Sequence, residues 1–147
     1  APIESPDTDA CVAKWKPWED TEKEILRICV GKPGFIDRAL PETKNKYVDK
    51  EGLRRELTAF KAAWPELKER IRKQIIPFEE VRRRLKLVGA PYEPEQLGVS
   101  RARFRDTFAK IPYMRSRFSN IDIAYRCGFM DEWLERLFGK GGIWEVE

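Results

Sequence analysis

Apolar residues recur at every third or fourth position along most of this 147-residue chain. The longest run consists of Leu53, Leu57, Phe60, Trp64, Leu67, Ile71 and Ile75. This spacing places all seven side chains on one face of an α-helix, and Asp49 is a suitable N-cap. Pro65 lies inside the run and lacks a backbone N–H. We therefore expect either two helices or one bent helix between residues 49 and 75.

Helix-capping residues divide the rest of the chain into further helices. We expect these near residues 5–15, 18–30, 34–48, 77–88, 100–111, 119–127 and 131–138. The predicted N-terminal signals are Ser5 with Pro6, then Pro77, Ser100, Ser119 with Asp122, and Asp131. In the helix near 77–88, the residues expected to face inward are Phe78, Val81, Leu85 and Val88. The sequence thus predicts one all-α domain over residues 1–147, a multi-helix orthogonal bundle of about seven or eight helices.

The residues that most often carry out chemistry are scarce. The chain has no histidine, which is the commonest metal ligand and the usual general base near neutral pH. The acidic pairs Glu79-Glu80 and Asp131-Glu132 each fall in the first turn of an expected helix, where the helix dipole favours negative charge. We therefore interpret both pairs as structural and predict no catalytic, cofactor-binding or metal-binding residue in this chain.

The glycines near the C-terminus give no nucleotide-binding motif either. Gly139, Gly141 and Gly142 follow an expected helix, whereas a phosphate cradle lies at a helix N-terminus. Trp144 comes just after them, and the sequence leaves open whether it packs back on this domain or fills a groove on another. The other four tryptophans, Trp15, Trp18, Trp64 and Trp133, are expected in the core or an interface.

Three features bear on compartment and partners. Cys11, Cys29 and Cys127 are odd in number and widely spaced, which favours a reduced, cytoplasmic protein. No stretch has the roughly 20 apolar residues of a membrane span, and no secretory signal is present. Residues 68–117 hold 14 Lys and Arg against 6 Asp and Glu. We interpret this excess as solvated helix faces rather than as a site for a phosphate-bearing partner, with most arginines between 101 and 117 exposed; a role for them in a subunit interface stays open. We expect neither a membrane nor a nucleic-acid partner.

One local segment resembles a DNA-binding motif. Residues 119–129, SNIDIAYRCGF, followed by Asp131 and by the segment RLFGK at 136–140, resemble the second helix-turn-helix of AraC-type transcription activators. In that family the helix after the glycine turn enters the major groove. Here that helix would present Asp131, Glu132 and Glu135 to the phosphates, which would repel them. A helix-turn-helix regulator is therefore kept as an alternative only.

A longer resemblance covers about residues 77–144. The segments LVGAP at 87–91, PEQLGVS at 94–100, Phe104-Arg105, IPYMRSRF at 111–118 and Ile121-Asp122 resemble, in order and spacing, the C-terminal end of the sn-glycerol-1-phosphate dehydrogenases. These enzymes belong to the iron-containing alcohol dehydrogenase superfamily. Because this resemblance explains the same segment and some fifty residues more, we prefer it to the regulator.

The resemblance implies a two-domain enzyme that reduces dihydroxyacetone phosphate with NADH or NADPH and a divalent metal, zinc or nickel. In the family, the glycine-rich nucleotide-binding segment and the Asp, His and His metal ligands lie upstream of the matched region. No residue of this chain inherits those roles. We therefore expect this chain to be a C-terminal fragment, and the first residue, Ala1 instead of Met, favours the same expectation. The fragment is expected to be inactive alone and to pack against an N-terminal nucleotide-binding domain. A homo-oligomer, a free-standing relative and a protein-interaction bundle remain open.

Overall fold

A computed structural model describes residues 6–146, and all regular structure in that range is helical. The α-helices are α1 (Thr8–Lys14), α2 (Trp18–Ile28), α3 (Pro33–Lys46), α4 (Lys50–Gln74), α5 (Phe78–Leu87), α6 (Arg101–Lys110), α7 (Asn120–Arg126) and α8 (Met130–Phe138). Two short 3-10 helices, η1 (Pro94–Leu97) and η2 (Ile111–Tyr113), flank α6. The prediction of an all-α bundle of seven or eight helices is confirmed. No helix in this range combines the length and the hydrophobicity that crossing a membrane requires.

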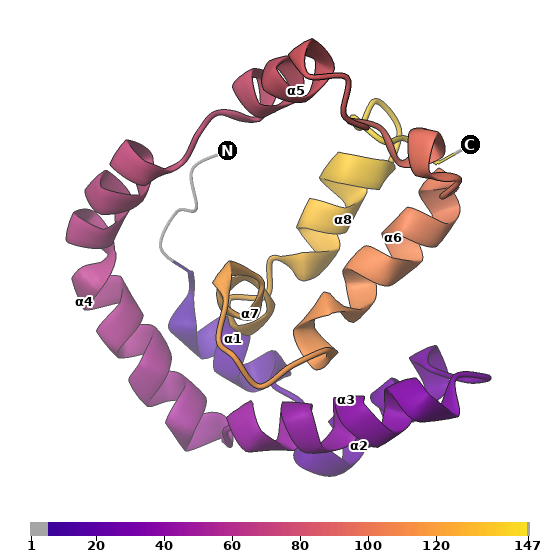
Figure 1. The fold of residues 1–147 in the computed structure, drawn as a ribbon. Coiled ribbons are helices and arrows are strands. Elements are labelled where there is room, and N and C mark those ends of the chain that lie inside the picture. The colour runs from indigo at the N-terminus through magenta and orange to yellow at the C-terminus, as the bar shows by residue number, and fades with distance from the viewer. Residues whose placement is uncertain (1–5, 147) are drawn as a thin grey trace.

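The helices form an open arc around a more compact group (Figure 1). α4 and α5 curve along one side, α2 and α3 lie at its foot, and α6 and α8 lie side by side within it. α1 packs against the N-terminal half of α4. The arc leaves the far half of α4 without a helix packed closely on it within residues 6–146.

Two separate clusters of buried residues form part of the core, which also includes Ala124, Met130, Leu134 and Phe138. The first joins α1, α4 and the end of α7 through Val12, Leu53, Leu57 and Cys127. The second joins α2, α3 and η2 through Ile25, Cys29, Ala39 and Tyr113. Leu53 and Ile25 are fully buried, and burying a side chain of this size stabilises a fold by about 1.5–3 kcal/mol.

Several predicted caps are confirmed. The Asp49 carboxylate accepts a hydrogen bond from the Gly52 N–H at 2.7 Å, and the Ser100 hydroxyl accepts one from the Arg103 N–H at 3.2 Å. Ser119 forms the predicted capping box with Asp122 at the start of α7. Pro65 does not divide the long helix, since α4 runs without interruption from Lys50 to Gln74.

Two predicted helix starts are wrong. Asp7, and not Ser5, caps α1, because its carboxylate accepts bonds from the Asp9 and Ala10 N–H groups; Ser5 itself lies outside the described residues. Asp131 does not cap α8, because the N-cap is Phe129, two residues earlier, and the helix begins at Met130. The reason is the tight turn after α7. In that turn Gly128 has φ +73° and the Phe129 N–H bonds back to the Ala124 carbonyl, so the next helix starts immediately.

The predicted inward face of α5 is also wrong. Phe78, Val81 and Val88 are 44%, 39% and 74% exposed. A helical apolar pattern shows that a helix has an apolar side, but it does not show that another element covers that side. α5 is held where Phe78 contacts the C-terminal segment and where Arg82 pairs with Glu93 beside the Tyr92 ring.

The C-terminal segment settles the position of Trp144, which the sequence left open. Its ring packs on Phe104, Phe138 and Phe78, with centroid separations of 5.0, 6.0 and 5.8 Å. We call Phe78, Phe104, Phe138 and Trp144 the aromatic clamp. The indole N–H donates to the Glu93 carboxylate at 3.1 Å. The clamp therefore ties α5, α6, α8 and the chain end together, and Trp144 docks on its own domain.

Candidate functional site

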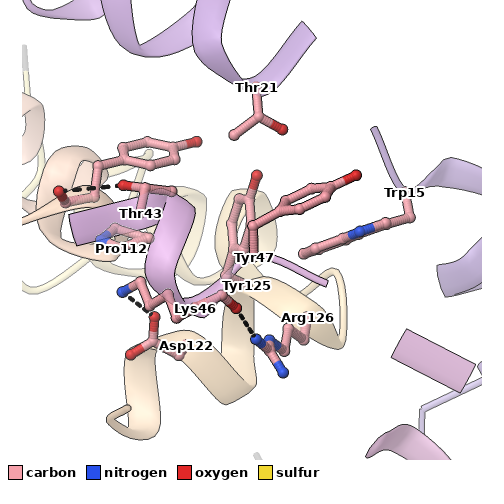
Figure 2. A pocket seen from close by; sticks show the side chains of 10 residues that line it. Trp15, Thr21, Thr43, Lys46, Tyr47, Pro112, Asp122, Tyr125 and Arg126 are labelled. Carbon is pink, nitrogen blue, oxygen red and sulfur yellow. Dashed lines mark hydrogen bonds and ion pairs between the residues drawn. The ribbon is translucent and has the colours of Figure 1, made fainter. Parts of the chain in front are cut away.

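A buried polar cluster lies where α3 meets α7 and η2 (Figure 2). At its centre the Lys46 ammonium pairs with the Asp122 carboxylate at 2.5 Å. Both side chains are nearly buried, at 12% and 6% exposure. Asp122 also accepts bonds from the Ser119 N–H and hydroxyl at 2.8 and 2.9 Å. One carboxylate thus caps α7 and neutralises a lysine of α3.

Arg126 extends this cluster towards α4. Its guanidinium donates to the Lys46 carbonyl at 2.5 Å and forms an ion pair with Glu56. The Phe118 ring lies 4.7 Å from the guanidinium carbon. Burial lowers the pKa of Arg126 from its ordinary value, and its partners compensate for the desolvated charge. Arg126 therefore links α3, α4 and α7.

Two tyrosines close the other side of the cluster. The rings of Tyr113 and Tyr125 meet edge to face at 5.8 Å between centroids. The Thr43 hydroxyl donates to the Tyr113 carbonyl at 3.4 Å. Burial, which disfavours the phenolate, raises the pKa of both tyrosines. Both side chains therefore remain neutral hydrogen-bonding groups near neutral pH.

The cavity inside this cluster is too small for a substrate. Its volume is about 20 Å³, which is enough for one water molecule. The charges at its wall are paired with each other, as in a structural network. We conclude that the cluster fixes α3 on α7 and that its chemistry is structural.

The three cysteines lie in or beside the apolar core as free thiols. The Cys11 thiol donates to the Cys127 carbonyl at 3.3 Å. Burial raises the pKa of Cys127 to about 12 and also raises the pKa of Cys11 and Cys29. Since the thiolate is the reactive form, these thiols are suited to packing rather than to nucleophilic chemistry.

Raised thiol and phenol pKa values predict that alkaline pH destabilises the fold. In the unfolded chain Cys127 loses its proton near its ordinary pKa of 9.0, whereas in the folded chain it keeps the proton up to about 12. The unfolded state then binds fewer protons, so the free energy of unfolding falls as pH rises above about 9. Urea titrations at about pH 8 and about pH 10 measure this fall. Between these two pH values, the Cys127→Ala variant should lose less free energy of unfolding than the unsubstituted chain. If the free energy of unfolding of the unsubstituted chain stayed the same or rose, the raised pKa of Cys127 would be contradicted.

The acidic pairs considered as acid–base candidates lie apart, in the first turns of α5 and α8. Hydrogen bonds from Arg83 and Arg84 hold the pKa of Glu80 at about 2. Such a carboxylate stays ionised and is a poor general acid at neutral pH. Within residues 6–146, no group of three or more His, Cys, Asp or Glu side chains is placed to hold a metal ion.

The helix-turn-helix segment consists of α7 and α8 joined at Gly128. Arg126 is only 7% exposed and is held by Glu56 and the Lys46 carbonyl, so it does not face a phosphate. Arg136 pairs with Glu132 at 3.5 Å. The position of Arg126 weighs against the regulator alternative, since this basic residue is engaged within the domain, whereas the pair of Arg136 lies on the surface.

The arginines between 101 and 117 are mostly on the surface, as predicted. Arg101 is the exception among them, being partly buried. It pairs with Glu95 at 2.7 Å and donates to the Glu145 carbonyl at 3.3 Å. It thus helps to hold the C-terminal segment beside α6.

An apolar groove between α4 and α7 is the feature that sequence patterns did not predict. Its volume is about 360 Å³. It is lined by Glu56, Leu57, Ala59, Phe60, Phe118, Ile123, Arg126 and Cys127. The two helices are more than forty residues apart in the chain, so no local pattern brings these side chains together. The groove lies where the apolar face of α4 leaves its contact with α1.

No protein-family model, curated protein or solved structure matches this chain.

Proposed function

We propose that this chain is the C-terminal helical domain of an NAD(P)- and metal-dependent glycerol-1-phosphate dehydrogenase-like oxidoreductase. In the intact enzyme it packs against an N-terminal nucleotide-binding domain and closes one wall of the cleft between them. It carries out no chemistry by itself. Its three reduced thiols favour a cytoplasmic enzyme.

The residues that carry the family resemblance support this proposal because several of them form turns and helix caps. Gly98 adopts φ +69°, a left-handed conformation that favours glycine, and Ser100 then caps α6. Ser119 and Asp122 form the capping box of α7. A relative that shares these residues in the same order is expected to turn at the same points.

The observation that carries the proposal is the uncovered apolar surface where α4 meets α5. Ile75, Ile76, Phe78 and Val81 are 58%, 46%, 44% and 39% exposed. They lie within seven residues of one another, from the end of α4 to the first turn of α5. Clustered exposure of large apolar side chains is typical of a surface that another protein segment covers. A domain that is one half of an enzyme requires such a surface.

The proposal assigns the cofactors to the preceding domain. The family's metal ligands are an aspartate and two histidines, and this chain has no histidine; the described residues also assemble no alternative set. NADH or NADPH and the zinc or nickel ion would therefore be held by residues outside this sequence. Here the role of the chain is to complete the cleft.

The test compares the complete protein with the 147-residue chain. The complete coding sequence should encode a glycine-rich nucleotide-binding loop, an aspartate and two histidines ahead of Ala1. Its product should reduce dihydroxyacetone phosphate with NADH or NADPH in the presence of zinc or nickel, while the chain alone should not. The absence of that upstream pattern would overturn the proposal, and so would dehydrogenase activity or tightly bound zinc in the isolated chain.

A further inference from the structure

The apolar face of α4 continues well beyond its contact with α1. Leu53 and Leu57 are buried against α1. The same face goes on through Phe60, Trp64, Leu67, Ile71 and Ile75, which change from partly buried to 58% exposed at Ile75. Phe60 and Trp64 pack on each other at 5.2 Å between centroids. We call this second set the α4 strip.

The α4 strip and the groove between α4 and α7 form one continuous apolar surface. Leu57 and Phe60 belong to α4 and also line the groove. From Leu57 to Ile75 the surface is about 27 Å long, at 1.5 Å per helical residue. A long, narrow apolar surface of this kind matches the apolar face of one helix of about 18 residues, rather than a small molecule. Leu53 and Leu57 on the same face are buried in the cluster with α1, so the strip lies on the side of α4 that packs on α1. Figure 1 shows α1 inside the arc.

The charges along one edge of the strip are basic, while Glu56, which lines the groove, is paired with Arg126. On a helical projection, Lys61, Lys68 and Arg72 lie along one edge of the strip, while Glu66 and Glu69 lie towards the other side of the helix. Arg72 pairs with Glu69 at 3.2 Å, so Lys61 and Lys68 carry the free charge of this edge. Residues 61–75 contain five basic and two acidic side chains. Within residues 6–146, no carboxylate lies within ion-pair distance of Lys61 or Lys68. The strip therefore favours an occupant whose apolar face is flanked by acidic residues.

We propose that the groove and the α4 strip seat an amphipathic helix with an acidic flank, supplied by the preceding part of the same polypeptide. This inference rests on the proposed function and names where the missing domain docks. A second copy of this chain would bring the same basic edge to the surface, and like charges would oppose one another. A flat anionic bilayer matches the charge, but it cannot enter a groove that lies between two helices.

A fluorescein-labelled model peptide tests whether the groove and the α4 strip of the 147-residue chain bind a helix. The probe is an 18-residue helical peptide with Leu at every third or fourth position and Glu on the flanks. A second peptide has Lys at the Glu positions. We expect the Glu peptide to bind at least about tenfold more tightly in anisotropy titrations, because only it complements the basic edge.

Substitutions on opposite sides of α4 provide matched variants. Leu67→Glu places a charge in the strip and should weaken binding of the Glu peptide by about tenfold or more. Ala62→Glu adds the same charge on the opposite, exposed side of the helix and should have little effect. The double variant Lys61→Glu with Lys68→Glu should reverse the preference towards the Lys peptide. Far-UV circular dichroism confirms that each variant remains helical.

Several outcomes would overturn the inference. These are equal binding of the two peptides, no binding of either, and equal effects of Leu67→Glu and Ala62→Glu. Dimerisation in light scattering that Leu67→Glu abolishes would assign the strip to a second copy. Binding to phosphatidylglycerol vesicles without binding to the Glu peptide would assign it to a membrane surface. If the peptide binds but the upstream sequence lacks a nucleotide-binding domain, the helix-binding site on α4 is supported and the dehydrogenase proposal fails.

Discussion

Asp122→Ala is expected to lower the free energy of unfolding by about 3–5 kcal/mol, which is typical when one partner of a buried ion pair is removed. The substitution leaves the Lys46 ammonium, only 12% exposed, without its counter-charge. It also removes the acceptor of the Ser119 N–H and hydroxyl and so opens the capping box of α7. Urea denaturation followed by circular dichroism measures the loss.

An exposed ion pair provides the matched control for this experiment. Asp9 pairs with Arg54 at 2.5 Å, but its carboxylate is 82% exposed. Asp9→Ala should cost less than about 1 kcal/mol, because solvent screens surface pairs. The double substitution Lys46→Met with Asp122→Asn should recover part of the loss, since no charge is then left buried. Equal losses for Asp122→Ala and Asp9→Ala would show that the buried cluster contributes little to stability.

Trp144→Ala is expected to destabilise the domain by about 3 kcal/mol, at the lower end of the range for large aromatic residues because Trp144 is partly buried. The substitution removes the central ring of the aromatic clamp and the hydrogen bond to Glu93. The other side-chain contacts of α5 are with the connector that follows it, where Arg82 pairs with Glu93 and Lys86 lies over the Tyr92 ring. Hydrogen exchange should therefore speed up most in α5, while the amides of α2 and α3 should change little.

Trp144→Phe separates the two contributions of this side chain. It keeps an aromatic ring against Phe104 and Phe138 but lacks the indole N–H, so it should cost about 1 kcal/mol, the value of one hydrogen bond. Protection of α5 should largely remain. If Trp144→Ala left hydrogen exchange in α5 unchanged, the aromatic clamp would not be what holds that helix.

The helical class and most helix boundaries could be predicted from local residues. Asp49, Ser100 and the Ser119–Asp122 pair act within three residues of the helix they start, so the chemistry of each cap is visible in the sequence. The error at Asp131 has a local cause too. The turn at Gly128 is tight enough to place the N-cap of α8 at Phe129, two residues before Asp131, and the identity of capping residues alone does not reveal that geometry.

The buried cluster was predicted only in part. Asp122 was identified as a capping residue, but its ion pair with Lys46 joins residues 76 positions apart. The partners of Arg126, Glu56 and the Lys46 carbonyl, are 70 and 80 positions away. No periodic pattern links such positions, because the contacts depend on how α3, α4 and α7 pack. Arg126 belongs to the segment that resembles a DNA-binding motif, but its side chain lies inside the domain.

The sequence by itself determined that the chain is helical, where most helices begin, which side of each is apolar, and that histidine-based chemistry is absent. These properties depend on residues within one or two helical turns of each other. Only the tertiary structure decided which apolar sides are covered: Leu53 is buried by α1, Trp144 closes on its own domain, and Leu67 and Phe78 remain partly or largely open. Coverage depends on distant segments meeting in space, and periodicity along one helix does not encode that meeting.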